Sequence, residues 1–246
     1  QQAFPALAVL TRTPPNGSLA QAISLNLYDR NTLDIPLTNG DVLRVPKAGK
    51  QLANSVALTG AVNRPGNYGW FEGMRVSNLI NDVRTDLLRE ADLSYALLVR
   101  YRNTLLDISV AQFSLLDAIS QPGTGSDPLL QEFDELIVFS LPELEGIETS
   151  SANSRRQLLK PVIEKLRAQA RDNEPVQIVS ISGAVRAPGV YPLTEGNTLK
   201  DLIAAAGGLK DSAFLEAAEY RRLSETQNGE VIAKYADINL QRVLNG

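Results

Sequence analysis

The chain of 246 residues contains no cysteine and no histidine, and it has one tryptophan and one methionine. Without cysteine it cannot form disulfides, thiolate metal sites or a cysteine nucleophile, and without histidine it has no imidazole general base. The lack of disulfides does not argue against a periplasmic location, where they are permitted but not required.

Long apolar runs and an excess of basic residues are also missing. No run reaches about 18 apolar residues, so we expect no membrane-spanning helix in this chain. The net charge of −4 argues against a nucleic-acid partner, because phosphate binding favours a basic surface. The first residues lack the layout of a signal peptide, so we expect any export signal to lie upstream or to have been removed.

One unusual phrase occurs twice, as GAVNRPGNYGWFEG at residues 60–73 and as GAVRAPGVYPLTEG at residues 183–196. An offset of 123 residues aligns Gly60 with Gly183 and continues through the following segment. Identical residues then stand at Ala61, Val62, Pro65, Gly66, Tyr68, Glu72, Gly73, Leu79 and Ile80 and at their partners in the second copy. The sequence therefore contains a repeated structural unit.

Each copy is predicted to start with a β-hairpin. The segments NSVALTGAV and VQIVSISGAV alternate apolar and polar residues, as strands do. The pairs Pro65-Gly66 and Pro188-Gly189 occupy the central positions of a predicted type II turn, in which glycine accepts a positive φ. We interpret these four residues as structural turn residues.

A helix is predicted after each hairpin, over Val76–Val83 and Leu199–Ala206, from apolar residues at helical spacing. Asn197 or Thr198 can cap the second helix, and Gly207-Gly208 can end it in the left-handed conformation. The first copy has no glycine pair, so its helix end is less well defined.

Strands are then predicted at 95–102 and 217–224, and a closing strand lies within PLLQEFDELIVF at 128–139. The segment PLTNGDVLRVP at 36–46 shares its Pro-Leu and Asp-x-Leu-x-Val pattern. We expect Leu129, Leu136 and Val138 to face inward.

These patterns divide the chain into four parts. They are the tail of a preceding module at 1–46, a complete second module at 54–141, a helical connector at 151–174, and a third module without its closing strand at 176–246. The tail residues Leu37, Leu43 and Val45 are predicted to cover the second module or the open third module, either within the chain or in a neighbouring one.

A hairpin, a crossing helix and returning strands resemble a β-grasp layout, so the expected fold is α+β with tandem β-grasp modules. The phrase V-x-G-x-V-x-x-P-G-x-Y, followed by a helix that ends in Ala-Gly-Gly, resembles the soluble-ligand-binding β-grasp (SLBB) repeat. Tandem copies are similar to those of Wza-type outer-membrane polysaccharide export proteins. The lipidated N-terminal cysteine and the C-terminal membrane helix of that family are absent from this sequence.

The resemblance implies the periplasmic part of a capsule or exopolysaccharide export protein, associated with the outer membrane through parts not in this chain. The implied partners are a polysaccharide, further copies of the same chain in a ring or collar, and an inner-membrane polysaccharide co-polymerase. No cofactor and no catalytic residue is implied. The alternative is a periplasmic receptor that binds a small soluble ligand through the same modules.

The candidate contact residues lie in and beside the predicted turns. Asn63, Arg64, Asn67 and Arg186 are polar and no structural rule demands them there. Trp70 shares strand parity with Tyr68 and is assigned to the core, whereas Phe71 has the opposite parity and is the expected exposed aromatic.

Two charged segments are assigned structural roles. The acidic stretch 127–148 lacks the spacing of a calcium loop, so it is interpreted as a solvated face rather than a metal site. The connector is an amphipathic helix with six basic residues, and we expect it to dock between modules rather than on a membrane. Pro161 predicts that this helix kinks or begins there.

Catalysis is not supported by the sequence. No nucleophile elbow and no phosphate-binding glycine loop occurs, and AAGGLK at 205–210 ends a helix instead of starting one. A glycosidase needs paired carboxylates in a cleft, and the carboxylates here cluster in a linker-like stretch. We therefore expect no hydrolase or transferase activity on polysaccharide.

Overall fold

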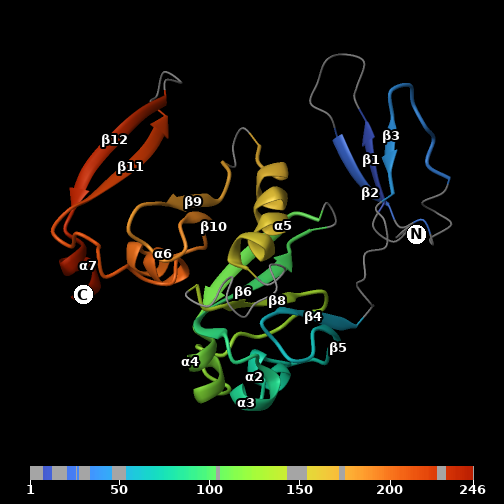
Figure 1. Ribbon diagram of the computed structural model, residues 1–246. Helices are drawn as coiled ribbons and strands as arrows, with labels where there is room; N and C mark the ends of the chain where they lie inside the picture. Colours follow the sequence, from blue (N-terminus) through green and yellow to red (C-terminus); the bar gives the residue numbers. More distant parts are fainter. Residues whose placement is uncertain are drawn as a thin grey trace.

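The structure of the chain is a computed structural model with a mixed α+β fold, built from several small sheets and short helices (Figure 1). It describes residues 8–12, 21–25, 27, 34–45, 54–103, 106–142, 154–171, 175–225 and 231–245.

The second module forms a five-stranded sheet with the order β5-β4-β8-β6-β7. Its strands are β4 (Ser55–Gly60), β5 (Gly66–Gly69), β6 (Ala91–Tyr101), β7 (Ile108–Phe113) and β8 (Glu135–Ser140). The last strand, β8, lies in the middle, parallel to β4 and antiparallel to β6. The predicted hairpin, returning strand and closing strand of this module are therefore present.

Both faces of this sheet are buried. In β8, Leu136 and Val138 point into one core, which contains residues of the first hairpin and the short helices. Ile137 and Phe139 point into a second core on the opposite face, together with residues of the connector helix and the third module. Alternate side chains of a strand face opposite sides, so one strand serves two cores.

The predicted helix over Val76–Val83 is wrong as a continuous element. The structure has two one-turn helices instead, α2 (Val76–Leu79) and α3 (Val83–Asp86). The break comes at Ile80, which is extended and fully buried, and the Asp86 carboxylate then accepts hydrogen bonds from two backbone N–H groups in the gap. Local side-chain hydrogen bonds of this kind compete with helix continuation.

The interpretation of 127–148 as a solvated acidic face is wrong for two of its carboxylates. Asp127 is fully buried and accepts hydrogen bonds from Ser77 N–H and Oγ at the start of α2. Asp134 is 1% exposed and forms an ion pair with Arg100 at 2.7 Å. Both carboxylates stabilise the fold. The part of the stretch after residue 142 lies outside the described residues.

The closing segment 128–139 is only partly as predicted. Leu136 and Val138 are fully buried, as expected, but Leu129 is 49% exposed and its neighbour Leu130 is buried. The segment is irregular before β8, and Leu130 N–H donates to Met74 O, which directs Leu130 rather than Leu129 inward. A short helix, α4 (Leu115–Ser120), precedes it and is capped by Ser114.

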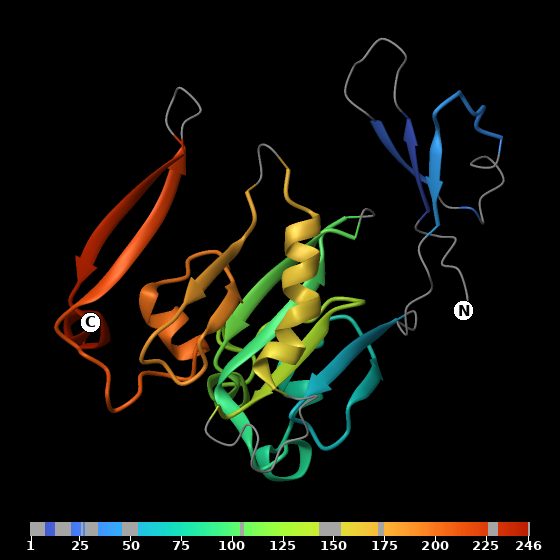
Figure 2. The ribbon, with the colours of Figure 1, turned by 45° about the horizontal axis from the view of Figure 1, so that its top comes forward.

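The connector contains α5 (Arg155–Ala168), which crosses the sheet in Figures 1 and 2. It packs Leu159, Val162 and Leu166 into the core shared by the sheet and the third module, so docking between modules is confirmed. Of the two alternatives for Pro161, a helix that begins there is wrong, and a kink there stays a prediction. Ser154 caps the helix seven residues before the proline, and the helix continues through it.

The third module consists of two separate hairpins and two helices. They are β9 (Ile178–Ile181), β10 (Gly189–Pro192), α6 (Leu199–Ala205), β11 (Ala218–Glu225), β12 (Val231–Ile238) and α7 (Leu240–Asn245). Thr198 caps α6, and Gly207 and Gly208 follow it with φ of 74° and 90°, as predicted. In the described part of the chain, β9–β10 and β11–β12 are independent two-stranded sheets.

The first residues form a three-stranded sheet of order β2-β1-β3, from β1 (Ala8–Arg12), β2 (Gln21–Leu25) and β3 (Val42–Arg44). The predicted covering role of the tail is wrong within this chain, because Leu37, Leu43 and Val45 are 74%, 49% and 37% exposed. β3 pairs only with β1 in the described residues, and in both views this sheet lies apart from the five-stranded sheet (Figures 1 and 2).

A buried charge joins three parts of the fold. Arg155, at the start of α5, is 2% exposed and pairs with Asp92 of β6. Its guanidinium also donates to the carbonyl oxygen of Ala205 in α6 and lies over the Tyr95 ring, 5.2 Å from the centroid. A buried arginine needs such partners to offset its lost hydration, so this junction fixes the third module against the sheet.

Candidate functional site

The two Pro-Gly turns do not have the predicted conformation. A type II turn needs a glycine φ near +80°, but φ of Gly66 is 158° and Gly189 has no positive φ. Gly60 and Gly183, five residues before each Pro-Gly proline, are left-handed instead, with φ of 94° and 91°. At Gly60 an added Cβ would lie 1.9 Å from Val138 O, so only glycine fits beside β8.

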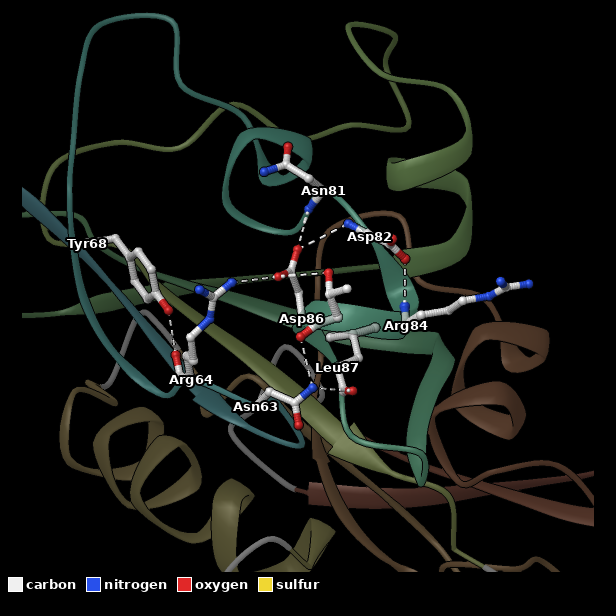
Figure 3. Close-up of polar contacts among 9 residues, drawn as sticks. Asn63, Arg64, Tyr68, Asn81, Asp82, Arg84, Asp86 and Leu87 are labelled. Atoms are coloured by element: carbon white, nitrogen blue, oxygen red, sulfur yellow. Dashed lines mark hydrogen bonds and ion pairs between the residues drawn. The ribbon is translucent and has the colours of Figure 1, made fainter.

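Polar side chains tie the first turn to the segment that follows α2 (Figure 3). The Asn63 side-chain amide donates to Thr85 O at 2.9 Å and to Leu87 O at 3.0 Å. Arg64 forms an ion pair with Asp86 at 2.9 Å, although its side chain is 76% exposed. Both candidate residues therefore have structural partners as well as exposed surface.

Asp86 is the centre of this cluster. Its carboxylate accepts from the backbone N–H groups of Asn81 and Asp82 and from Arg64 (Figure 3). Burial raises the pKa of Asp86, but the two backbone hydrogen bonds and Arg64 outweigh it, so the net pKa is lowered from its ordinary value. The carboxylate is thus held ionised and keeps the turn attached to α3.

The second turn repeats this attachment with backbone groups. Arg186 N–H donates to Gly208 O, and Ala187 N–H donates to Ala206 O, at the end of α6. Isolated β-bridges, Val62 with Leu87 and Val185 with Leu209, occur at the equivalent places in the two copies. The exposed Arg186 side chain also donates to Gly207 O at 3.4 Å.

The repeated tyrosine explains part of the repeated phrase. Tyr68 donates its hydroxyl to Arg64 O at 2.5 Å, and Tyr191 donates to Ala187 O at 2.6 Å. In both copies the acceptor is four residues earlier, immediately before the proline. The Pro-Gly-x-Tyr spacing therefore closes the hairpin through a side-chain to backbone hydrogen bond.

The aromatic predictions for the first copy are confirmed. Trp70 packs against the core and donates Nε1 to Leu130 O at 2.9 Å. Phe71 is 54% exposed. Asn67 is exposed on β5, opposite Ala57. These first-turn candidates belong to the second module, whereas Arg186 belongs to the third.

Sequence reasoning missed a groove of about 1090 Å³ between the sheet and the third module. One wall is β7, an edge strand of the sheet, and another is the segment after β10. Polar lining residues include Arg102, Gln112, Gln177, Glu195 and Asn197. They are spread over more than 90 residues of sequence, and no spacing pattern connects them.

In the described part of the chain, no three carboxylate, histidine or cysteine side chains are grouped as metal ligands would be. None of the described helices has the length and apolarity needed to span a membrane.

Comparison with known proteins identifies the repeat. The family model of the SLBB domain matches residues 55–83 and 178–233, which include the first hairpin of the second module and most of the third module. No curated protein matches the chain. The two copies of the phrase found in the sequence thus belong to two SLBB segments.

Proposed function

We propose that this chain is a non-enzymatic, periplasmic part of a polysaccharide export protein, and that its modules build a ring or collar through which a capsule or exopolysaccharide crosses the outer membrane. The observation that carries the proposal is the pair of SLBB segments, because this domain is common in polysaccharide export proteins. The further partner is an inner-membrane polysaccharide co-polymerase, and the outer-membrane attachment is made by parts not in this chain.

The module architecture proposed is a tandem β-grasp. The sheet order of the second module supports it, since the first hairpin and the returning hairpin flank a last strand that runs parallel to the first. The third module has both hairpins and the helix in the same sequence order. The equivalent tyrosine hydrogen bonds and β-bridges support the same unit in both places.

The contacts of the buried carboxylates support a structural rather than a catalytic role for this chain. The buried carboxylates Asp92, Asp127 and Asp134 bind Arg155, the start of α2 and Arg100, respectively. A general acid or a nucleophile needs a carboxylate that faces substrate. These three carboxylates are instead saturated by contacts within the fold.

The second candidate function is a receptor for a small soluble ligand, and the groove beside β7 favours it. Its volume of about 1090 Å³ is slightly larger than the range of about 300–1,000 Å³ that ordinary ligand sites have. Measurement of solution mass and of glycan binding separates the two functions. An export role predicts an assembly of many copies with weak, polymer-tolerant glycan binding. A monomer with one tight small ligand would contradict it and support the receptor.

A further inference from the structure

β7 is an edge strand of the five-stranded sheet, and its residues line the groove. Among the described strands, β7 pairs only with β6, from Ile108 opposite Tyr101 to Phe113 opposite Ala96. Edge strands present a row of backbone N–H and C=O groups to whatever lies beside them. Here the residues of β7 line the groove that separates it from the third module.

Gln169 shows which backbone groups of β7 face outward. Its side-chain amide donates to Ile108 O at 2.9 Å and accepts from Ile108 N–H at 2.8 Å, as a neighbouring strand would. Backbone groups of alternate residues in an antiparallel strand point to the same side. Val110 and Gln112 therefore direct their N–H and C=O groups into the groove, beyond the pair that Gln169 occupies.

The facing wall adds amide and hydroxyl groups. Asn197 donates to the Gln112 side chain at 3.2 Å across the groove, and Thr194 donates to Asn197. Gln177 is exposed at the same wall. Side-chain amides have both donors and acceptors, so this wall can donate hydrogen bonds to hydroxyl groups or accept hydrogen bonds from them.

Charge at the groove is mixed. Arg102 and Arg222 are exposed lining residues, and Glu195 lies among them with the opposite sign. Arg100 is already paired with Asp134. Such a surface has no single-sign field that would select a strongly charged ligand such as a nucleic acid.

We infer that this groove binds a segment of the polysaccharide chain, with the backbone of Val110 and Gln112 and the amides of Gln112, Gln177 and Asn197 as its hydrogen-bonding groups. The inference rests on the proposed function and names its binding site. Sugar hydroxyls donate and accept, which matches paired N–H and C=O groups and amides. An extended peptide fits less well, because Gln169 already occupies the outward groups of Ile108 and leaves only two residues for a strand ladder.

The test is an NMR titration of the ¹⁵N-labelled chain with oligosaccharides of about six sugars, cut from the polysaccharide of the producing cell. The amide signals of Val110 and Gln112 should shift. Gln112→Ala and Gln177→Ala should each weaken binding about fivefold, the effect of one lost hydrogen bond. Gln131→Ala, an exposed glutamine outside the groove lining, is the matched control and should bind as the parent does. Melting temperatures of the three variants establish that they are folded.

Several outcomes would overturn the inference. One is that only amide signals of the Pro-Gly turns shift when the oligosaccharide is added. Another is that Gln131→Ala weakens oligosaccharide binding as much as the groove variants do. A third is that a peptide of residues 36–45, and not the oligosaccharide, shifts the amide signals of the groove. Absence of any oligosaccharide binding would also overturn the inference. If polysaccharide export by the cell nevertheless depends on this protein, the proposed function is still supported. Export that does not need the protein would remove the proposed function itself.

Discussion

The second and third modules start with the same phrase but finish differently. In the second module, β8 lies between β4 and β6 and joins both hairpins into one sheet. In the third module, the hairpins β9–β10 and β11–β12 remain separate among the described residues, and β11–β12 extends away from the rest (Figures 1 and 2). The comparison teaches that the closing strand, and not the repeated phrase, unites a module.

The two closing segments, 128–139 and 36–46, share a sequence pattern but differ in burial. Leu136 and Leu43 occupy the same position of the Asp-x-Leu-x-Val pattern, but the first is fully buried and the second is 49% exposed. Leu136 lies between Leu58 and Leu98, whereas Leu43 has only one strand neighbour among the described residues, at Leu10. Burial therefore follows from two neighbouring strands rather than from the pattern itself.

The largest expected effect comes from a matched glycine pair. Gly60→Ala should destabilise the chain by more than about 3 kcal/mol, because the new Cβ would meet Val138 O at 1.9 Å. Gly183→Ala has a similar positive φ but no atom within 4 Å of the new Cβ, so it should cost only about 1–2 kcal/mol for the left-handed conformation. Urea unfolding of both variants measures the difference. If both variants lose the same free energy of unfolding, the proposed clash between a Cβ at position 60 and Val138 O is contradicted.

The closing leucines give the next largest difference. Leu136→Ala should lower the free energy of unfolding by about 2–5 kcal/mol, as deletion of a buried leucine side chain does. Leu43→Ala should change it by no more than about 0.5 kcal/mol, as substitution at an exposed site does. A large loss for Leu43→Ala would mean that the tail is covered in solution, and analytical ultracentrifugation would show whether a second copy covers it.

A smaller effect is expected at the repeated tyrosines. Tyr191→Phe should cost about 1 kcal/mol, since Tyr191 is 3% exposed and Ala187 O loses its donor there. Tyr68→Phe should cost less, because the Tyr68 hydrogen bond is exposed and water replaces the donor. Thermal unfolding of the two variants provides the measurement. A larger loss of stability for Tyr68→Phe than for Tyr191→Phe would contradict the conclusion that the Tyr191 hydrogen bond is the more buried one.

The smallest expected effect depends on pH. The pKa of Asp86 is lowered in the folded chain, so its stabilisation is present above the unfolded pKa of about 3.9 and is lost as pH falls through the folded value. Asp86→Asn should therefore be less stable than the parent at about pH 6, and this difference should shrink as pH falls below about 3.9. A difference that stays constant over this range would contradict an ionised Asp86 at the first turn.

Much of the strand pattern could be predicted from the sequence, because it depends on local alternation and on the repeat. The hairpin strands, the returning strands and the caps of α6 are where those patterns predict them. The break between α2 and α3 could not be predicted in this way, since it depends on the Asp86 carboxylate binding backbone N–H groups in the gap.

Long-range contacts account for the other differences. Arg155 is one of the basic residues in the amphipathic connector pattern, yet it is buried because Asp92 lies opposite it in the folded chain, 63 residues away in sequence. The groove beside β7 depends on Gln112 and Asn197, which are 85 residues apart. The turn candidates Asn63, Arg64, Asn67, Phe71 and Arg186 are exposed as expected, and their contact with a ligand stays a prediction.

The most direct test of the export function is the amount of polysaccharide released by cells that lack this protein. Cells supplied with the unaltered full-length protein should regain extracellular polysaccharide. Cells supplied with Gly60→Ala should not, because the second module loses its closing strand, and Gly183→Ala should restore most of the release. Unchanged release in cells that lack the protein altogether would contradict the account.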